Sequence, residues 1–135
     1  PPEVIVCNDW QMSFVPIIGK QVFKNDEFYK NIKYVYLIHS YDQMKAFNKE
    51  SFNSIGLSSK DFNLKDNHLN AVNNADFTII LNDVNKPIID KIKKNNSLYK
   101  TLLGMKKKYK VYDINYNSDD FKETINKIVD DVRSL

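Results

Sequence analysis

Short apolar runs rich in β-branched and aromatic residues recur along the chain, and polar residues follow each of them. These runs are Val4–Cys7, Tyr34–Ile38, Phe77–Leu81 and Val111–Ile114. They are continuous and do not alternate strictly with polar residues, which is typical of strands buried on both faces of a parallel sheet. The pattern predicts a layered α/β domain with right-handed crossovers and a mainly parallel sheet of about four strands.

Segments of helical character follow the apolar runs. They are expected at Trp10–Phe23, within Tyr41–Asn74, at Val84–Lys94 and at Ser118–Ser134. The last segment has the clearest pattern, because Phe121, Ile125 and Ile128 begin an apolar stripe at helical period, with Ser118 as the expected N-cap. The stretch from Asp42 to Asp66 lacks a sustained period, so we interpret it as a long connection with short helical turns.

Length and composition fit one globular unit. The chain has 135 residues, of which 42% are hydrophobic and 27% charged, and we predict a single α/β domain over residues 1–135. No run approaches the roughly 20 apolar residues of a membrane-spanning helix, and the N-terminus lacks the pattern of a signal peptide. We therefore expect no membrane partner and a cytoplasmic location, or a plastid if a parent chain carries a transit peptide. Because the sequence begins with Pro1, we expect a segment of a longer chain.

Charge and cysteine content exclude several classes of function. The net charge is +3, and Arg133 is the one arginine among 20 basic residues. Nucleic-acid recognition relies on arginine forks, so we expect no nucleic-acid partner. A single cysteine cannot form an internal disulfide, and with two histidines it cannot complete a structural zinc site. We expect no metal and no cofactor, and we expect Cys7 to be a buried small hydrophobic residue.

Polar side chains gather at the predicted strand ends. In open α/β sheets, ligands bind outside the carboxyl ends of the strands. The residues at these ends are Asn8 to Gln11, His39 and Ser40, Asn82 and Asp83, and Asn115 and Tyr116. All can form hydrogen bonds, as a sugar or nucleotide cleft requires. The alternative is that they serve only as caps and turns, which also favour Asn, Asp and Ser.

More specific catalytic motifs do not occur. The three glycines, Gly19, Gly56 and Gly104, form neither a P-loop nor a dinucleotide fingerprint. Asp9, His39 and Ser40 include the residue types of a hydrolase triad. However, no glycine-flanked elbow surrounds Ser40, and the neighbouring His and Ser side chains are expected to point apart. His68 opens an apparent helix and is expected at the surface.

Taken in order, four segments across residues 2–117 resemble the starch and glycogen synthases. Pro2–Gln11, continuing to Pro16, is similar to the family's strand and loop with a His-Asp-Trp-His or Asn-Asp-Trp-His signature. Lys30–Ser40 resembles the strand that ends in Thr-Ile-His-Asn. Leu69–Ile80 resembles a helix and strand with Lys-Ala-Gly, Ala-Asp and Val-Thr-Thr-Val, and Val111–Asn117 stands where the family has Leu-Asn-Gly-Ile-Asp. The shared order carries the resemblance, since no single match is specific.

The resemblance implies the second half of the N-terminal, three-layer Rossmann-like domain of a two-domain retaining glucosyltransferase. In that family ADP-glucose or UDP-glucose binds between the two domains, and glucose is added to an α-1,4-glucan. It implies substrate-binding roles for Asp9, Trp10, Gln11 and His39. The strand-end positions add Asn82 and Asn115 as further candidate substrate-binding residues. No residue is assigned a catalytic role.

Departures from the family pattern leave three hypotheses open. Gln11 replaces the second histidine of the loop and cannot carry a proton, and Tyr112-Asp113 replaces Asn-Gly. The family's Lys-Thr-Gly-Gly-Leu loop would precede Pro1. We favour a degenerate segment that is not catalytically competent alone and has a structural, protein-interaction or glucan-docking role. The alternatives are part of an active ADP- or UDP-glucose-dependent glucosyltransferase completed by a second domain, and an unrelated α/β nucleotide-binding regulatory module.

Overall fold

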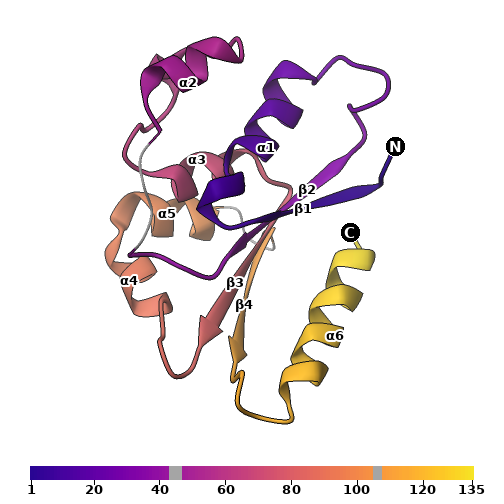
Figure 1. The fold of residues 1–135 in the computed structure, drawn as a ribbon, viewed down its shortest axis with the longest axis vertical. Coiled ribbons are helices and arrows are strands. Elements are labelled where there is room, and N and C mark those ends of the chain that lie inside the picture. The colour runs from indigo at the N-terminus through magenta and orange to yellow at the C-terminus, as the bar shows by residue number, and fades with distance from the viewer. Residues whose placement is uncertain (43–46, 105–107) are drawn as a thin grey trace.

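A four-stranded parallel sheet forms the centre of the computed structural model, which describes residues 1–42, 47–104 and 108–135. The strands are β1 (Val4–Asn8), β2 (Lys33–Ile38), β3 (Phe77–Asp83) and β4 (Tyr109–Ile114). All three neighbouring pairs are parallel, which confirms the predicted sheet. The apolar pattern could not predict the strand order, which is β1-β2-β3-β4 (Figure 1).

Helical elements follow each strand. After β1 come η1 (Trp10–Met12), α1 (Phe14–Ile17) and the π-helical turn η2 (Ile18–Val22); after β2 come α2 (Lys49–Ser54), η3 (Ser59–Asp61) and α3 (Asn67–Asn74). After β3 come α4 (Ile89–Lys94) and α5 (Asn96–Gly104), and α6 (Phe121–Arg133) follows β4. Helix α5 was not predicted, because the polar residues 93–97 interrupt the apolar pattern at its start.

The helices cover both faces of the sheet. Helices α1, α3, α4 and α5 lie on one face, and α6 lies on the other (Figure 1). Side chains alternate along each strand, so Tyr36 and Ile38 face the first group while Val35 faces α6. Cys7 is fully buried on the first face, as predicted. The three-layer Rossmann-like fold is therefore confirmed.

A third apolar cluster lies beside α1. The buried Phe52 of α2 packs there with Ile17 and Leu57, and Phe14, Phe47 and Phe62 adjoin them. Phe14 and Phe47 stack with their ring centroids 4.1 Å apart, and Phe52 and Phe62 stack at 4.8 Å. The described part of this connection thus consists of short helical turns, as predicted, held by aromatic packing.

Two local predictions are wrong. The N-cap of α6 is Asp120 and not Ser118, because Ser118 closes a turn with Asn115 and its hydroxyl accepts from the Asp120 N–H at 3.2 Å. His68 is completely buried, because the face of α3 that carries it packs against the sheet and the neighbouring helices. Within the three described ranges, no helix has the length and apolar character needed to cross a bilayer.

Candidate functional site

Asp9 occupies a special backbone position at the end of β1. Its φ of 62° and ψ of −171° lie in a region that residues other than glycine rarely adopt, and the residue is 1% exposed. The Asp9 N–H donates to the Leu37 carbonyl at 2.8 Å, which ties this turn to β2. The carboxylate accepts from the Trp10 N–H at 3.0 Å. These bonds direct a buried carboxylate toward the loop that follows β2.

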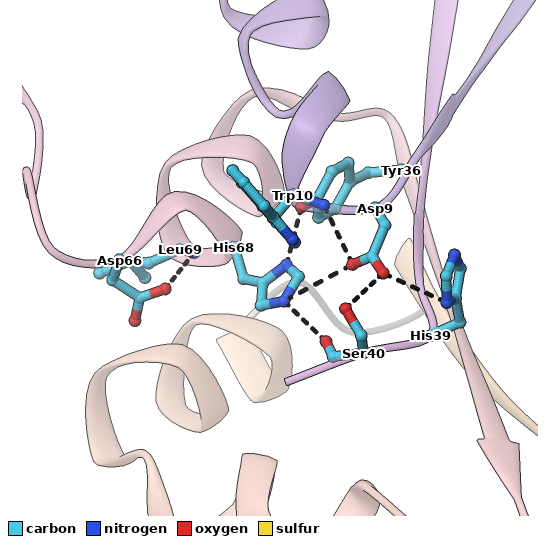
Figure 2. A network of polar contacts seen from close by, with 8 residues as sticks. All are labelled: Asp9, Trp10, Tyr36, His39, Ser40, Asp66, His68 and Leu69. Carbon is cyan, nitrogen blue, oxygen red and sulfur yellow. Dashed lines mark hydrogen bonds and ion pairs between the residues drawn. The ribbon is translucent and has the colours of Figure 1, made fainter. Parts of the chain in front are cut away.

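His39 and Ser40 both reach the Asp9 carboxylate (Figure 2). The Ser40 hydroxyl donates to Asp9 Oδ2 at 2.6 Å, and His39 Nδ1 lies 3.2 Å from the same oxygen. The two side chains therefore do not point apart, contrary to the expectation from sequence. The arrangement is still no hydrolase triad. In a triad the serine hydroxyl donates its hydrogen bond to the imidazole, whereas here it donates to the carboxylate.

His68 lies on the other side of this carboxylate and connects it to the core. Its Nε2 is 2.9 Å from the Ser40 carbonyl oxygen, its Nδ1 is 2.7 Å from the Tyr36 hydroxyl, and Nε2 is 3.8 Å from Asp9 Oδ1 (Figure 2). The ring of Tyr41 stacks on the imidazole with centroids 6.2 Å apart. Burial lowers the pKa of His68, an effect that the Asp9 charge opposes. Burial, assisted by the Asp9 charge, raises the pKa of Tyr36, so its hydroxyl keeps its proton.

A pocket of about 590 Å³ opens beside His39, where β2 and β3 end. It is lined by His39, Ser40, Tyr41, Asp42, Leu81, Asp83, Lys86, Pro87, Ile88, Lys91 and Tyr116. The His39 side chain is 42% exposed and Tyr116 is 52% exposed. Lys91 pairs with Asp42, and the remaining charged side chains of the lining are Lys86 and Asp83. Positive and negative charges are thus balanced around the pocket.

Another cavity, of about 610 Å³, lies at the opposite edge of the sheet. Its lining includes Val4 and Lys33, the first residues of β1 and β2, together with Phe28 and Leu135. It is therefore remote from the carboxyl ends of the strands, where ligands bind in open α/β sheets. Among the described residues, no group of three His, Cys, Asp or Glu side chains is placed to hold a metal ion.

The six candidate residues from the sequence separate into three groups. Asp9 and His39 come together, and of the six only His39 is in the lining of the pocket beside it. Trp10 and Gln11 lie on η1, where Trp10 is half-buried near Phe47 and Gln11 is exposed.

Asn82 is the second-last residue of β3, and Asn115 begins the turn that follows β4. The Asn82 amide donates to Asp113 at 2.8 Å and accepts from the N–H groups of Ile88 and Ile89 at 2.9 and 3.1 Å. The Asn115 side chain accepts from Asn85 at 3.3 Å and from the Asn117 N–H at 3.1 Å. Both amides therefore hold turns, and the Asn82 turn positions the pocket residues that precede α4.

Sequence reasoning missed His68 and the tyrosines around it. One signal was present: His68, Ala71, Val72 and Ala75 recur at helical spacing, which places His68 on the buried stripe of α3. Tyr36 was assigned only to a strand, and Tyr41 and Lys86 were not considered because they stand beyond the immediate strand ends.

The chain is similar to known proteins over its first part. The sequence profile of the starch synthase catalytic domain matches residues 1–84, which include Asp9, His39 and His68. Glycogen synthase of Clostridium perfringens (strain 13 / Type A) is 49% identical over 39 residues, 29% of this chain and 8% of that protein. Glycogen synthase of Desulforudis audaxviator (strain MP104C) is 34% identical over 61 residues, 45% and 12% of the two chains.

A third relative gives the same result. Glycogen synthase of Pelodictyon phaeoclathratiforme (strain DSM 5477 / BU-1) is 42% identical over 53 residues, 36% of this chain and 11% of that protein. The matched segments thus span 8% to 12% of the length of these relatives. The profile match covers more than half of the chain, which overturns the alternative of an unrelated regulatory module. This chain belongs to the family of the starch synthase catalytic domain.

Proposed function

We propose that this chain forms the glucan-binding wall of a starch/glycogen synthase-like module and does not transfer glucose by itself. The observation that carries the proposal is the half-exposed His39, held by the buried carboxylate of Asp9 at the edge of a 590 Å³ pocket. A pocket of this size accommodates sugar units, and a few directed polar groups give such sites their orientation and specificity.

The chemistry of the pocket suits a neutral, hydroxyl-rich ligand. His39 and Asp83 can accept hydrogen bonds from sugar hydroxyls, and Lys86 can donate to them. The exposed ring of Tyr116 offers a flat apolar surface for a sugar face. Because the lysines of the lining are matched by Asp42 and Asp83, the pocket offers no excess of positive charge for a diphosphate. This balance favours an α-glucan over a nucleotide sugar.

The absence of transfer follows from the chemistry of the reaction. Glucosyl transfer from a nucleotide sugar needs groups that stabilise the negative charge developing on the leaving diphosphate. In the pocket described above, Lys91 is already paired with Asp42, and Lys86 is the other lysine of the described lining. Gln11 stands on exposed η1 and cannot carry a proton to a reacting group.

One observation favours a second candidate, a part of an active glucosyltransferase that uses ADP-glucose or UDP-glucose. Asp9 and His39, which the family resemblance places in the cleft, are preserved and in contact with each other. In this version a further domain or a protein partner would face the same edge of the sheet and supply the missing cations. The nucleotide sugar would then bind between the two parts.

Calorimetric and thermal-shift titrations test the proposal with maltoheptaose, ADP-glucose and UDP-glucose as separate ligands. A ligand at 100 times its Kd stabilises a protein by about 2.7 kcal/mol, so binding of maltoheptaose should raise the melting temperature clearly. His39→Ala should weaken binding about tenfold, the effect of losing about 1.4 kcal/mol of binding free energy. Asn126→Ala, on the exposed surface of α6, serves as the matched control and should bind normally.

The outcomes separate the candidates. Stabilisation by nucleotide sugars but not by maltoheptaose would replace the glucan-docking role with the second candidate. No stabilisation by any of the three ligands would contradict the sugar-binding function altogether.

A further inference from the structure

The half-exposed His39 can bind a ligand in one geometry only if neighbouring groups fix the orientation and the proton position of its ring. Its side chain is 42% exposed, and its Nδ1 lies 3.2 Å from Asp9 Oδ2. A neutral imidazole can carry its proton on either nitrogen, and the hydrogen bond at one nitrogen determines what the other can do. The state of His39 therefore depends on how firmly Asp9 is held.

A directional series of hydrogen bonds runs from the core to Asp9 (Figure 2). A carbonyl oxygen can only accept, so His68 Nε2 must donate to the Ser40 carbonyl at 2.9 Å. In the neutral ring Nδ1 then has no proton and accepts from the Tyr36 hydroxyl at 2.7 Å. The Ser40 carbonyl and the Tyr36 hydroxyl thus fix the proton positions of His68.

The same directional argument extends from Ser40 to His39. The Asp9 carboxylate can only accept, so the Ser40 hydroxyl donates to Oδ2 at 2.6 Å. His39 Nδ1 lies 3.2 Å from the same oxygen, and a bare nitrogen lone pair at that distance would repel the carboxylate. We therefore assign the ring proton to Nδ1, which leaves Nε2 of the neutral ring as the acceptor. Because His39 lines the 590 Å³ pocket, the acceptor is available to a ligand there.

We propose that His68 is a positioning residue for His39: together with Tyr36 and Ser40 it holds Asp9 and the backbone at Ser40, so that His39 keeps its proton on Nδ1 and offers Nε2 to a sugar hydroxyl. The ligand in this proposal rests on the proposed function. The state of the His39 ring does not, and it can be measured without any ligand.

The cost of this arrangement argues against a role in packing alone. His68 is 0% exposed and forms hydrogen bonds through both ring nitrogens, where an apolar side chain would fill the space without needing partners. Asp9 is also held at a positive φ, which persists only where the surroundings impose it. The carboxylate of this strained residue accepts from the Ser40 hydroxyl, and His68 holds the Ser40 backbone.

Nitrogen-15 NMR of the imidazole rings at a pH where both histidines are neutral tests the proposal directly. The chain has two histidines, so in a His68 variant every imidazole signal belongs to His39. In the wild-type chain we expect the Nδ1–H tautomer of His39 to dominate. In His68→Leu the signals should shift toward the mixture of a free imidazole, in which the Nε2–H form prevails. His68→Gln keeps a side-chain donor for the Ser40 carbonyl and should restore most of the wild-type signature.

A second variant keeps the test possible if the His68→Leu protein does not fold. If His68→Leu does not fold, Ser40→Ala removes the hydroxyl that donates to Asp9 without changing the buried core, and it should shift His39 in the same direction. Unchanged His39 signals in folded His68→Leu, or in Ser40→Ala if that variant must replace it, would overturn the proposal. The proposal would also be overturned if the His39 signals of folded His68→Gln matched those of folded His68→Leu.

Titration with maltoheptaose adds a readout of function. The folded variant that loses the Nδ1–H tautomer should bind several-fold more weakly, and His68→Gln should recover the affinity. If the wild-type chain binds no sugar but the tautomer responds as expected, the proposed function fails and the positioning role stands. If sugar binds equally well to all variants and the tautomer does not respond, the positioning role fails alone.

Discussion

Gly19 shows how closely a single residue can be constrained by its neighbour. It lies in η2, directly against the ring of Tyr34 at the start of β2, and a Cβ atom at this position would overlap that ring. Tyr34 is itself buried, at 4% exposure, so its ring has little space to move aside. The absence of a side chain at Gly19 therefore lets α1 and η2 approach the sheet.

Gly19→Ala is expected to destabilise the fold by about 1–3 kcal/mol, the usual range for overpacking a filled core. Chemical denaturation followed by circular dichroism measures this change. Gly104→Ala is the matched control: among the described residues outside its own helix backbone and chain neighbours, no atom lies within 4 Å of the added Cβ. Alanine also favours the helix by up to about 1 kcal/mol. Equal stability of Gly19→Ala and the wild-type chain would show that Tyr34 moves freely.

Some individual residues of the candidate site could be predicted from the sequence, and others could not. The rule that ligands bind at the carboxyl ends of parallel strands identified Asp9 and His39, which are in contact. It could not distinguish them from Asn82, whose amide is occupied by Asp113 of β4 and by the Ile88 N–H of the turn before α4. The helical spacing of His68, Ala71 and Val72 indicated the buried face of α3, but the partners of His68, Tyr36 and Ser40, come from a distant part of the chain and no local pattern gives them.

Helix α6 is attached to the sheet by a polar contact as well as by its apolar stripe. Ile128 packs on the sheet, while Tyr112 and Lys110 of β4 both donate to Asp131, the lysine at 2.9 Å. The apolar stripe was evident in the sequence. The contact to Asp131 was not, because its partners are some twenty residues away on a strand whose position beside α6 only the fold establishes.

This contact predicts a dependence of stability on pH. The hydrogen bond from Tyr112 and then that from Lys110 hold the pKa of Asp131 below its ordinary value of 3.8. A carboxyl whose pKa is lower in the folded state stabilises the fold above its unfolded pKa, and this contribution disappears as the pH falls through the folded value. Asp131→Asn should therefore melt at a lower temperature than the wild-type chain at pH 7.

The difference in melting temperature should shrink as the pH falls below 3.8 and disappear once the pH lies below the lowered pKa of folded Asp131. Thermal melts recorded across this range check the prediction. Asp130→Asn, at the exposed neighbouring position of α6, is the control and should follow the wild-type curve. A constant difference between Asp131→Asn and wild type at all pH values would mean that the substitution acts through packing and not through charge.

Across the whole molecule, the sheet and the connection after β2 differ in how they are held. Strands β2 and β3 are paired on both sides and buried between two helical layers. Their largely continuous apolar runs made them predictable, because burial on both faces favours apolar residues along the strand. The connection with α2 and η3 is held by a separate aromatic cluster against α1, and its scattered phenylalanines gave no periodic signal.

Native-state hydrogen exchange should therefore divide the molecule into two regions. Amides of β2 and β3 should exchange only through global unfolding, while those of α2 exchange through local opening. Phe52 is 1% exposed at the centre of the aromatic cluster, so Phe52→Ala should accelerate exchange in α2 and η3 by at least about tenfold, since 1.4 kcal/mol of local stability already gives that factor. Central amides such as Ile79 should change much less. A uniform acceleration throughout the chain would instead show that the aromatic cluster and the sheet unfold as one cooperative unit.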